Sequence, residues 1–408
     1  MGADLSSDLP AMLGPRPAHP AARQRLLVNC SNLHVGGAVA VAASFIRCLS
    51  EDPPGDFEVS LLLSSAVHSN LKSLGTDLCE FGDYQIVDYY GLRSLWQGLH
   101  KYFERHDVVF TVFGPAYALR RATLHVCGFA QPLIIYPRNP IERRMALLDR
   151  WKQRLKYLVQ ELFFARADEL IVELEHVQLA LARRPILRRK PIHIVYNTVD
   201  SVFHDPQRWQ RVDIPLRSQA IKLGVVSRNY VHKNLVCLPL LKQRLQEAHN
   251  LPVEFYVTFT EYEWQVCPAS FRNVINNVGA LVLAQCPSFY AAMDGIIFPS
   301  LLECFSAVPL EAMYMRRPLF ASDLPFIRDC CHDLAIYFDP LSADSMAKAI
   351  AEYYRTLDAS TRSRRLDDAF EFVQRFPSPR DRARSYIELV RAASMRRTRA
   401  AAPARDES

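Results

Sequence analysis

The sequence lacks an apolar stretch long enough to span a membrane. Its apolar runs, such as FYAAMDGIIFPSLLECFSAVPLEAM, are interrupted by charges and prolines, whereas a spanning helix needs about 20 consecutive apolar residues. The first 22 residues have no basic segment followed by an apolar one, which a secretory signal requires. We therefore predict no membrane span, and a disordered leader over residues 1–22.

Paired cysteines and the common nucleotide fingerprint are also missing. The ten cysteines are scattered, with no Cys-x-x-Cys pair, so we expect neither disulfides nor structural zinc and predict a cytoplasmic protein. No Gly-x-Gly-x-x-Gly sequence is present, so a dinucleotide site is unsupported. No Asp-x-Asp follows a predicted strand, so a required metal ion is not implied, and we expect no cofactor.

The chain has a modest excess of positive charge, with 49 Lys and Arg against 43 Asp and Glu. The basic residues cluster, and in segment 141–157, predicted as one long helix, they alternate with Leu, Trp and Tyr. Such a segment suits an anionic membrane surface, at the inner face of the membrane. A solvated helix face is the alternative, and we expect no nucleic-acid partner.

Short β-branched runs alternate with helix-like segments, and the alternation occurs twice. This pattern predicts an α/β protein with two doubly wound, Rossmann-like domains that face a central cleft. A polar stretch with two prolines separates them. The predicted parts are a first domain over 23–205, a linker over 206–219, a second domain over 220–376, a last helix over 377–396 and a basic tail over 397–408.

The segment LLECFSAVPLEAM, residues 301–313, carries two carboxylates in an apolar setting. A carboxylate loses its hydration when it is buried, so it needs a partner there. Glu303 lies in a loop after a predicted strand, a helix should begin near Ser306 with this serine as its cap, and Glu311 lies inside the helix. The helix N-terminus can bind a phosphate, and the flanking carboxylates can accept from sugar hydroxyls, as a nucleotide sugar requires. The alternatives are a capping role for Glu303 and a surface position for Glu311.

Two further loops follow predicted strands. Arg228 and Lys233 lie five residues apart in GVVSRNYVHKNL and can neutralise a diphosphate. Solvated side chains on a loop are the alternative for both. Gly36 and Gly37 open the first predicted helix, where glycine lets the backbone approach a phosphate or sugar closely. A glycine pair alone is weak evidence for such a site.

Together these segments resemble the family 4 (group 1) retaining glycosyltransferases, which have the GT-B fold. ECFSAVPLEAM is similar to their Glu-x7-Glu signature, and SRNYVHKNL to their Gly-Arg-x4-Lys-Asn loop. IVYNTVDSVF, YFDPLSADSMAKAI and the last helix also resemble family segments, in the same order. The resemblance is strongest over 190–390. Residues 112–139 are similar to bacterial members that build surface polysaccharide.

The resemblance implies roles for particular residues. Arg228 and Lys233 would bind the donor diphosphate, Glu303 the sugar hydroxyls, and Glu311 the nucleotide ribose. Gly36 and Gly37 would approach the donor from the first domain, and the last helix would cross back to that domain. His125 would contact the sugar near the reacting carbon, with a purely structural role as its alternative. The remaining donor-loop positions are Cys304, Phe305 and Ser306.

The sequence departs from the family at several glycines. Cys304 and Ser306 stand where the family usually has glycine, as do Thr198 and Ser227. Side chains at 304 and 306 would narrow the loop that approaches the sugar, so the identity of the donor sugar stays open.

The resemblance implies a retaining glycosyltransferase of the hexosyltransferase type. It would move a sugar from a GDP- or UDP-sugar donor to a glycan or lipid-linked acceptor, in the synthesis of surface polysaccharide or lipopolysaccharide. One alternative is a sugar-nucleotide epimerase or a phosphorylase with the same architecture. The other is a protein that binds sugar nucleotides without catalysis.

Overall fold

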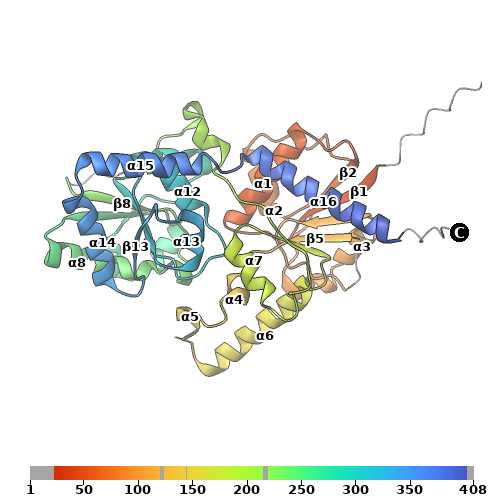
Figure 1. Cartoon of the computed structure of the whole chain (residues 1–408), viewed down its shortest axis with the longest axis horizontal. Coiled ribbons are helices and arrows are strands. Elements are labelled where there is room, and N and C mark those ends of the chain that lie inside the picture. Colours follow the sequence, from red (N-terminus) through yellow and green to blue (C-terminus); the bar gives the residue numbers. More distant parts are fainter. Residues whose placement is uncertain (1–22, 120–123, 144, 215–218, 402–408) are drawn as a thin grey trace, which may run out of the picture.

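A computed structural model describes residues 23–119, 124–143, 145–214 and 219–401. The predicted leader over 1–22 lies outside these ranges, as do residues 120–123 of the polysaccharide-like segment, residues 215–218 of the linker and residues 402–408 of the tail. The described chain forms two lobes, each built on a parallel sheet with helices on its faces (Figure 1). None of the described helices is both long and apolar enough to cross a membrane.

The first domain is built on a seven-stranded parallel sheet in the order β3-β2-β1-β4-β5-β6-β7. Central strands such as β1 and β4 are apolar and buried along most of their length, as expected when helices cover both faces of a parallel sheet. The strands are β1 (Gln24–Cys30), β2 (Phe57–Leu63), β3 (Asp83–Ile86), β4 (Val108–Thr111), β5 (Leu124–Gly128), β6 (Glu169–Val172) and β7 (Ile192–Ile194).

Helices connect these strands, and one prediction about them is wrong. Segment 141–157 is not one helix but spans a short helix and the start of a long one. The Asn139 side chain accepts from the amides of Ile141 and Glu142, which starts the short helix. The long helix begins only after Ala146, whose backbone is extended. The helices are α1 (Gly37–Glu51), α2 (Ser65–Ser73), α3 (Leu99–Glu104), α4 (Pro132–Ile135), α5 (Pro140–Arg143), α6 (Leu147–Phe164) and α7 (Glu175–Ala182).

The second domain repeats this architecture with six parallel strands in the order β10-β9-β8-β11-β12-β13. Both sheets therefore have the doubly wound order, which confirms the predicted fold class. The strands are β8 (Ile221–Val225), β9 (Val253–Val257), β10 (Asn276–Asn277), β11 (Gly295–Phe298), β12 (Leu319–Ser322) and β13 (Ile336–Phe338). The helices are α8 (Leu238–His249), α9 (Glu261–Gln265), α10 (Ala269–Arg272), α11 (Cys286–Ala292), α12 (Ala307–Tyr314), α13 (Pro325–Cys331), α14 (Ala343–Thr356) and α15 (Ala359–Val373).

The last helix, α16 (Pro379–Ala401), leaves the second domain and packs on α1 of the first (Figure 1). Tyr386 is buried there, with its ring centroid 5.3 Å from that of Phe45 and 5.2 Å from that of Phe110. At the rim, Arg391 forms two hydrogen bonds with Asp56. The helix is longer than expected, because residues 397–401 of the predicted tail belong to it.

The two domains also contact each other directly. The backbone amide and Nδ1 of His176, in α7, lie 2.8 and 2.9 Å from the Asp329 carboxylate in α13. The ring of Phe203, in the segment after β7, packs against Tyr290 of α11. These contacts join the segments that follow β6 and β7 of the first domain to helices α13 and α11 of the second.

Candidate functional site

Two loops of the second domain meet at the carboxyl ends of β8 and β11. These strands are neighbours in the sheet, so the loops that follow them start side by side. The amide of Leu301 donates to the carbonyl of His232 over 2.7 Å. Lys233 Nζ lies 2.5 Å from Glu303 Oε1. The structure thus joins two residues that sequence analysis placed in separate loops.

The Lys233–Glu303 pair is largely shielded from solvent. The side chains are 14% and 12% exposed, respectively, and Lys233 Nζ lies 5.1 Å from the centroid of the Phe298 ring. Charges in such a place are kept only when they are paired. Each group therefore holds the other in position, facing the cleft end of the sheet.

His232 belongs to the same cluster, and sequence analysis missed it. Its Nε2 lies 3.8 Å from Glu303 Oε1. Burial lowers the pKa of His232; Lys233 acts in the same direction, while Glu303 opposes them. The imidazole is therefore neutral at neutral pH, and it can donate a hydrogen bond from one ring nitrogen and accept one at the other. The sequence could have suggested His232 as a site residue, because it directly precedes Lys233 in the loop.

Arg228 is held by a residue from a different segment. Its Nε lies 3.3 Å from Glu263 Oε1. Glu263 also closes a capping box with Thr260 at the start of α9 and accepts from the amide of Asn229. Burial would raise the pKa of Glu263, but these hydrogen bonds and Arg228 outweigh it and lower the pKa. Sequence analysis missed Glu263, although the Thr-x-x-Glu spacing of a capping box is present.

Glu311 lies in α12 as expected and has a partner of its own. Tyr290 donates its hydroxyl to Glu311 Oε2 over 2.6 Å. Burial raises the pKa of Glu311 to about 7; the Tyr290 hydrogen bond opposes this rise and nearby Asp200 adds to it. Glu311 is therefore a weak acid that is partly protonated at neutral pH.

The loop before α12 differs in detail from the prediction. Ser306 is the N-cap of α12, but its side chain makes no capping hydrogen bond, so the expected role of its hydroxyl is wrong. The Cys304 side chain is buried in the core, and burial raises the pKa of its thiol well above the usual value. Residue 304 therefore does not narrow the cleft with its side chain. Phe305 and Ser306 are partly exposed.

The first domain supplies the predicted glycine pair and a polar cluster. Gly36 has a φ of +76° and precedes α1, which begins at Gly37, so the pair does open the first helix. A Cβ added at either glycine would meet nothing within 4 Å. Nearby, His34 Nε2 lies 2.9 Å from the carbonyl oxygen of Tyr89, and its ring stacks on Tyr90. Sequence analysis missed His34, although it lies in the same loop.

His125 does not lie where it was predicted. It is the second residue of β5, near the start of the strand and not after its end. Its side chain is buried, with Nε2 3.0 Å from Thr111 Oγ1 and its ring against Phe103. Burial lowers its pKa to about 3, with smaller contributions from Lys190 and Arg166. The imidazole is thus a neutral core group, which favours the structural alternative over the predicted sugar contact.

A buried ionisable cluster lies where α16 meets the segments that follow β6 and β7. Asn197 donates to Glu173 Oε1 over 2.6 Å, and Arg382 of α16 donates to Asn197 Oδ1. Burial raises the pKa of Glu173 to about 7, while Arg382 and the Asn197 hydrogen bond oppose the rise. Sequence analysis named the segment of Asn197 but neither Glu173 nor Arg382.

Residues 227–356 match the family model described as "Glycosyl transferases group 1". This segment contains Lys233, Glu303 and Glu311. A curated relative, the O-antigen chain mannosyltransferase RfbU of Salmonella typhimurium, is 23% identical over 141 residues. That alignment covers 34% of this chain and 39% of RfbU. The chain thus matches about two fifths of the length of this relative.

Solved structures match nearly the whole chain. Sucrose-phosphate synthase from Thermosynechococcus elongatus has a TM-score of 0.66 at 14% identity, over 91% of this chain and 99% of that one. Anabaena HepE in complex with UDP and glucose has a TM-score of 0.65 at 15% identity, over 91% of this chain and 100% of that one. The fold is GT-B. This is the fold class that the sequence predicted.

The described residues show no metal-binding group. Within the ranges that the structure covers, no three His, Cys, Asp or Glu side chains lie close enough together to hold a metal ion. The candidate site offers hydrogen bonding and charge: two cations and a neutral imidazole from one loop, and a carboxylate from the next.

Proposed function

We propose that this protein is a retaining glycosyltransferase that moves a hexose from a GDP- or UDP-sugar to a glycan or lipid-linked acceptor. The observation that carries the proposal is the Lys233–Glu303 pair, which lies at the carboxyl ends of β8 and β11 within the segment matching glycosyl transferases group 1. The names of the relatives support it, since one is a mannosyltransferase and another was solved with UDP and glucose.

In this proposal, Arg228 and Lys233 bind the donor diphosphate. Glu303 accepts hydrogen bonds from the sugar hydroxyls, and Glu311 binds the ribose. The bond between the anomeric carbon and the phosphate oxygen breaks as the acceptor oxygen bonds to that carbon on the same face. The departing phosphate oxygen takes the acceptor proton. The two cations stabilise the growing phosphate charge, which is the main protein contribution in such a step.

The relative's name also suggests a biological role. The acceptor would belong to surface polysaccharide or lipopolysaccharide synthesis, and the name of RfbU, an O-antigen chain mannosyltransferase, supports this. The cytoplasm, where nucleotide sugars are available, is the proposed location. Movement of the two domains toward each other would exclude water, which otherwise hydrolyses the donor.

A thermal-shift screen of UDP, GDP and their hexose derivatives tests the proposal. The correct donor should stabilise the protein by about 2.7 kcal/mol at a concentration 100-fold above its Kd. Lys233→Ala should abolish that shift. Lys242→Ala is the matched control, because Lys242 of α8 forms a similar ion pair with Glu254 of β9 over 2.8 Å. The proposal fails if no nucleotide sugar stabilises the protein, or if Lys233→Ala binds as the wild type does.

The stereochemistry needs a separate measurement. Proton NMR of the product, taken early in the reaction, should show the anomeric configuration of the donor. An inverted product would contradict the retaining mechanism and leave the transfer itself intact.

A further inference from the structure

Helix α6 presents an apolar surface to solvent. Its exposed large apolar side chains, between 45% and 73% accessible, are Leu147, Leu148, Trp151, Leu155, Leu158 and Leu162. From position 148 onward they recur every three or four residues, so they form one continuous stripe along the helix. By contrast, α8 and α16 each expose a single such residue, Leu240 and Met395.

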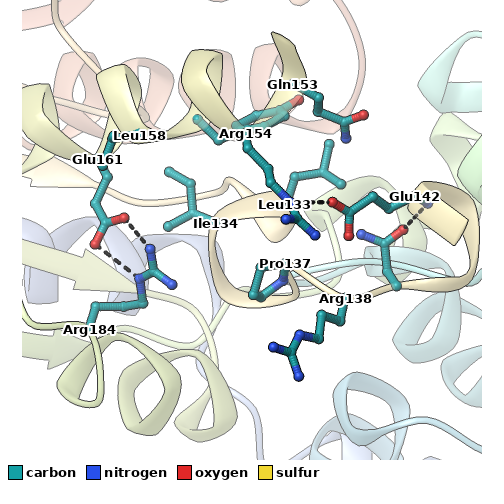
Figure 2. A pocket seen from close by; sticks show the side chains of 12 residues that line it. Leu133, Ile134, Pro137, Arg138, Glu142, Gln153, Arg154, Leu158, Glu161 and Arg184 are labelled. Atoms are coloured by element: carbon teal, nitrogen blue, oxygen red, sulfur yellow. Dashed lines mark hydrogen bonds and ion pairs between the residues drawn. The ribbon is translucent and has the colours of Figure 1, made fainter. Parts of the chain in front are cut away.

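The opposite side of α6 holds the helix to the first domain. Gln160, Glu161 and Phe164 are buried there. Figure 2 shows two ion pairs on this side: Glu161 with Arg184, and Glu142 Oε1 with Arg154 Nε at 2.7 Å. Together with α4 and α5, this side lines a cavity of about 350 Å³, and Leu158 at the edge of the stripe also borders it. Helix α6 thus differs from an ordinary surface helix: charged groups on one side pair with the protein, and the apolar stripe faces solvent.

Positive charge borders the stripe. At 3.6 residues per turn, Lys152 and Lys156 project along one edge of the stripe. Along the other edge, Arg154 is paired with Glu142, and Arg150 donates to the backbone carbonyls of Met145 and Arg143. Asp149 projects from the far side of the helix. Figure 1 shows α6 at the edge of the first domain away from α16, so neither α16 nor the second domain covers it.

We propose that the α6 stripe inserts into the surface of an anionic lipid bilayer. An amphipathic helix with Trp and Leu on one face and Lys and Arg beside them lies in the interface, with its apolar face in the acyl boundary. The flanking cations then meet anionic headgroups. A second copy of this chain fits less well, because a symmetric contact through α6 would bring like charges together. The contact goes beyond the proposed function and does not depend on it.

The apolar stripe predicts a different kind of membrane binding from the one that the positive charge of segment 141–157 predicts by itself. Charge alone predicts binding that salt screens and that no single apolar residue controls. The stripe predicts insertion, in which the apolar residues contribute as much as the cations. Trp151 and Leu155, near the middle of the stripe, should therefore be the most sensitive positions.

Flotation with phosphatidylglycerol/phosphatidylcholine vesicles tests the proposal on the full-length protein. The wild type should float with these vesicles and bind pure phosphatidylcholine weakly. Leu155→Glu should lower the partition coefficient at least ~10-fold, since a charge replaces an inserted side chain. Leu240→Glu, which changes an exposed leucine on α8, should bind as the wild type does. Thermal melting of each variant confirms folding, and a normal shift with nucleotide sugar separates this result from the proposed function.

A second readout places α6 in the bilayer. Brominated lipid should quench part of the tryptophan fluorescence of the wild type, and Trp151→Phe should lose that part while it still floats. The proposal is overturned if the wild type does not bind anionic vesicles, or if Leu155→Glu binds them unchanged. It is equally overturned if the wild type is a dimer that Leu155→Glu dissociates, because the stripe is then an interface between copies.

Discussion

Glu303 is the central residue of the candidate site, because its carboxylate pairs with Lys233 and lies 3.8 Å from His232 Nε2. Its partners come from the loop after β8, whereas Glu303 itself follows β11. In the proposed function, this carboxylate has two effects: it orients the Lys233 ammonium group for the donor diphosphate, and it offers acceptor oxygens to the sugar hydroxyls. Its loss should therefore affect both catalysis and stability.

For Glu303→Gln we expect kcat/KM to fall by about 100-fold or more, the usual loss when one charge-stabilising group is removed. We also expect a lower free energy of unfolding, by roughly 3 kcal/mol, because Lys233 is left buried without its counter-charge. Steady-state kinetics and urea unfolding measure the two effects. Glu254→Gln, which breaks the Lys242 pair instead, should leave kcat/KM unchanged. Equal loss in both variants would contradict the assignment.

A pH effect is expected from Glu173. Its pKa of about 7 lies above the model-peptide value of 4.5, so the folded protein binds this proton more tightly than the unfolded chain does. The stabilisation is complete below pH 4.5 and is lost as the pH rises to about 7. Glu311 shifts in the same direction and adds to the slope.

Glu173→Gln should flatten the fall in unfolding free energy between pH 5 and pH 8 by roughly 1–3 kcal/mol. Urea unfolding across this range provides the measurement. Glu175→Gln, two residues along at an exposed position, is the control and should keep the wild-type slope. An unchanged slope in Glu173→Gln would show that Glu173 titrates normally.

At the scale of elements, α16 packs in the first domain, although it follows α15 of the second domain in the sequence. Ala383, Tyr386 and Val390 are part of the core of the first domain, together with residues of α1 and β4. Two ion pairs at its rim, Arg380–Glu51 and Arg391–Asp56, fix its position along α1. The helix therefore stabilises the first domain and delivers Arg382 to the back of the cleft.

Tyr386→Ala should lower the free energy of unfolding by about 3–5 kcal/mol, the usual cost of removing a buried aromatic ring. Tyr386→Phe keeps the ring between Phe45 and Phe110 and should cost much less. Chemical unfolding followed by circular dichroism measures both. If the two variants are equally stable, the packing of α16 on α1 is not what holds this domain.

At the scale of the whole molecule, apolar packing and polar contacts both join the two domains. The His176–Asp329 contact joins α7 to α13. Burial would raise the pKa of Asp329, but the hydrogen bonds from His176 outweigh it and lower the pKa. The carboxylate is therefore ionised and holds the domains in the observed placement.

Asp329→Ala should shift the domains toward a more open arrangement. Two lost hydrogen bonds, worth about 1 kcal/mol each, change an open–closed equilibrium about 30-fold. Small-angle X-ray scattering should show a larger radius of gyration than for the wild type. Arg328→Ala is the control, because Arg328 pairs with Asp323 and Asp333 inside the second domain. The same radius of gyration in wild type and Asp329→Ala would contradict a role for this contact.

Much of the architecture was readable from the sequence because its signals are local. Buried β-branched runs and helical periodicity predicted two doubly wound domains. The polar residues that follow a strand predicted which loops carry Lys233 and Glu303, and the glycine pair predicted the start of α1. Each of these inferences needs only neighbouring residues and the rule that the carboxyl ends of parallel strands share one edge.

Tertiary packing alone decided the rest, since it depends on contacts between distant segments. His125 and Cys304 are buried because of what packs on them, and no local pattern shows that. Arg228 meets Glu263, Glu311 meets Tyr290, and Arg382 meets Asn197 only through folding. The sequence by itself determined the order of strands and helices and the charges of the loops. The structure decided which charges pair, because pairing and burial depend on the distances between side chains that the folded chain sets.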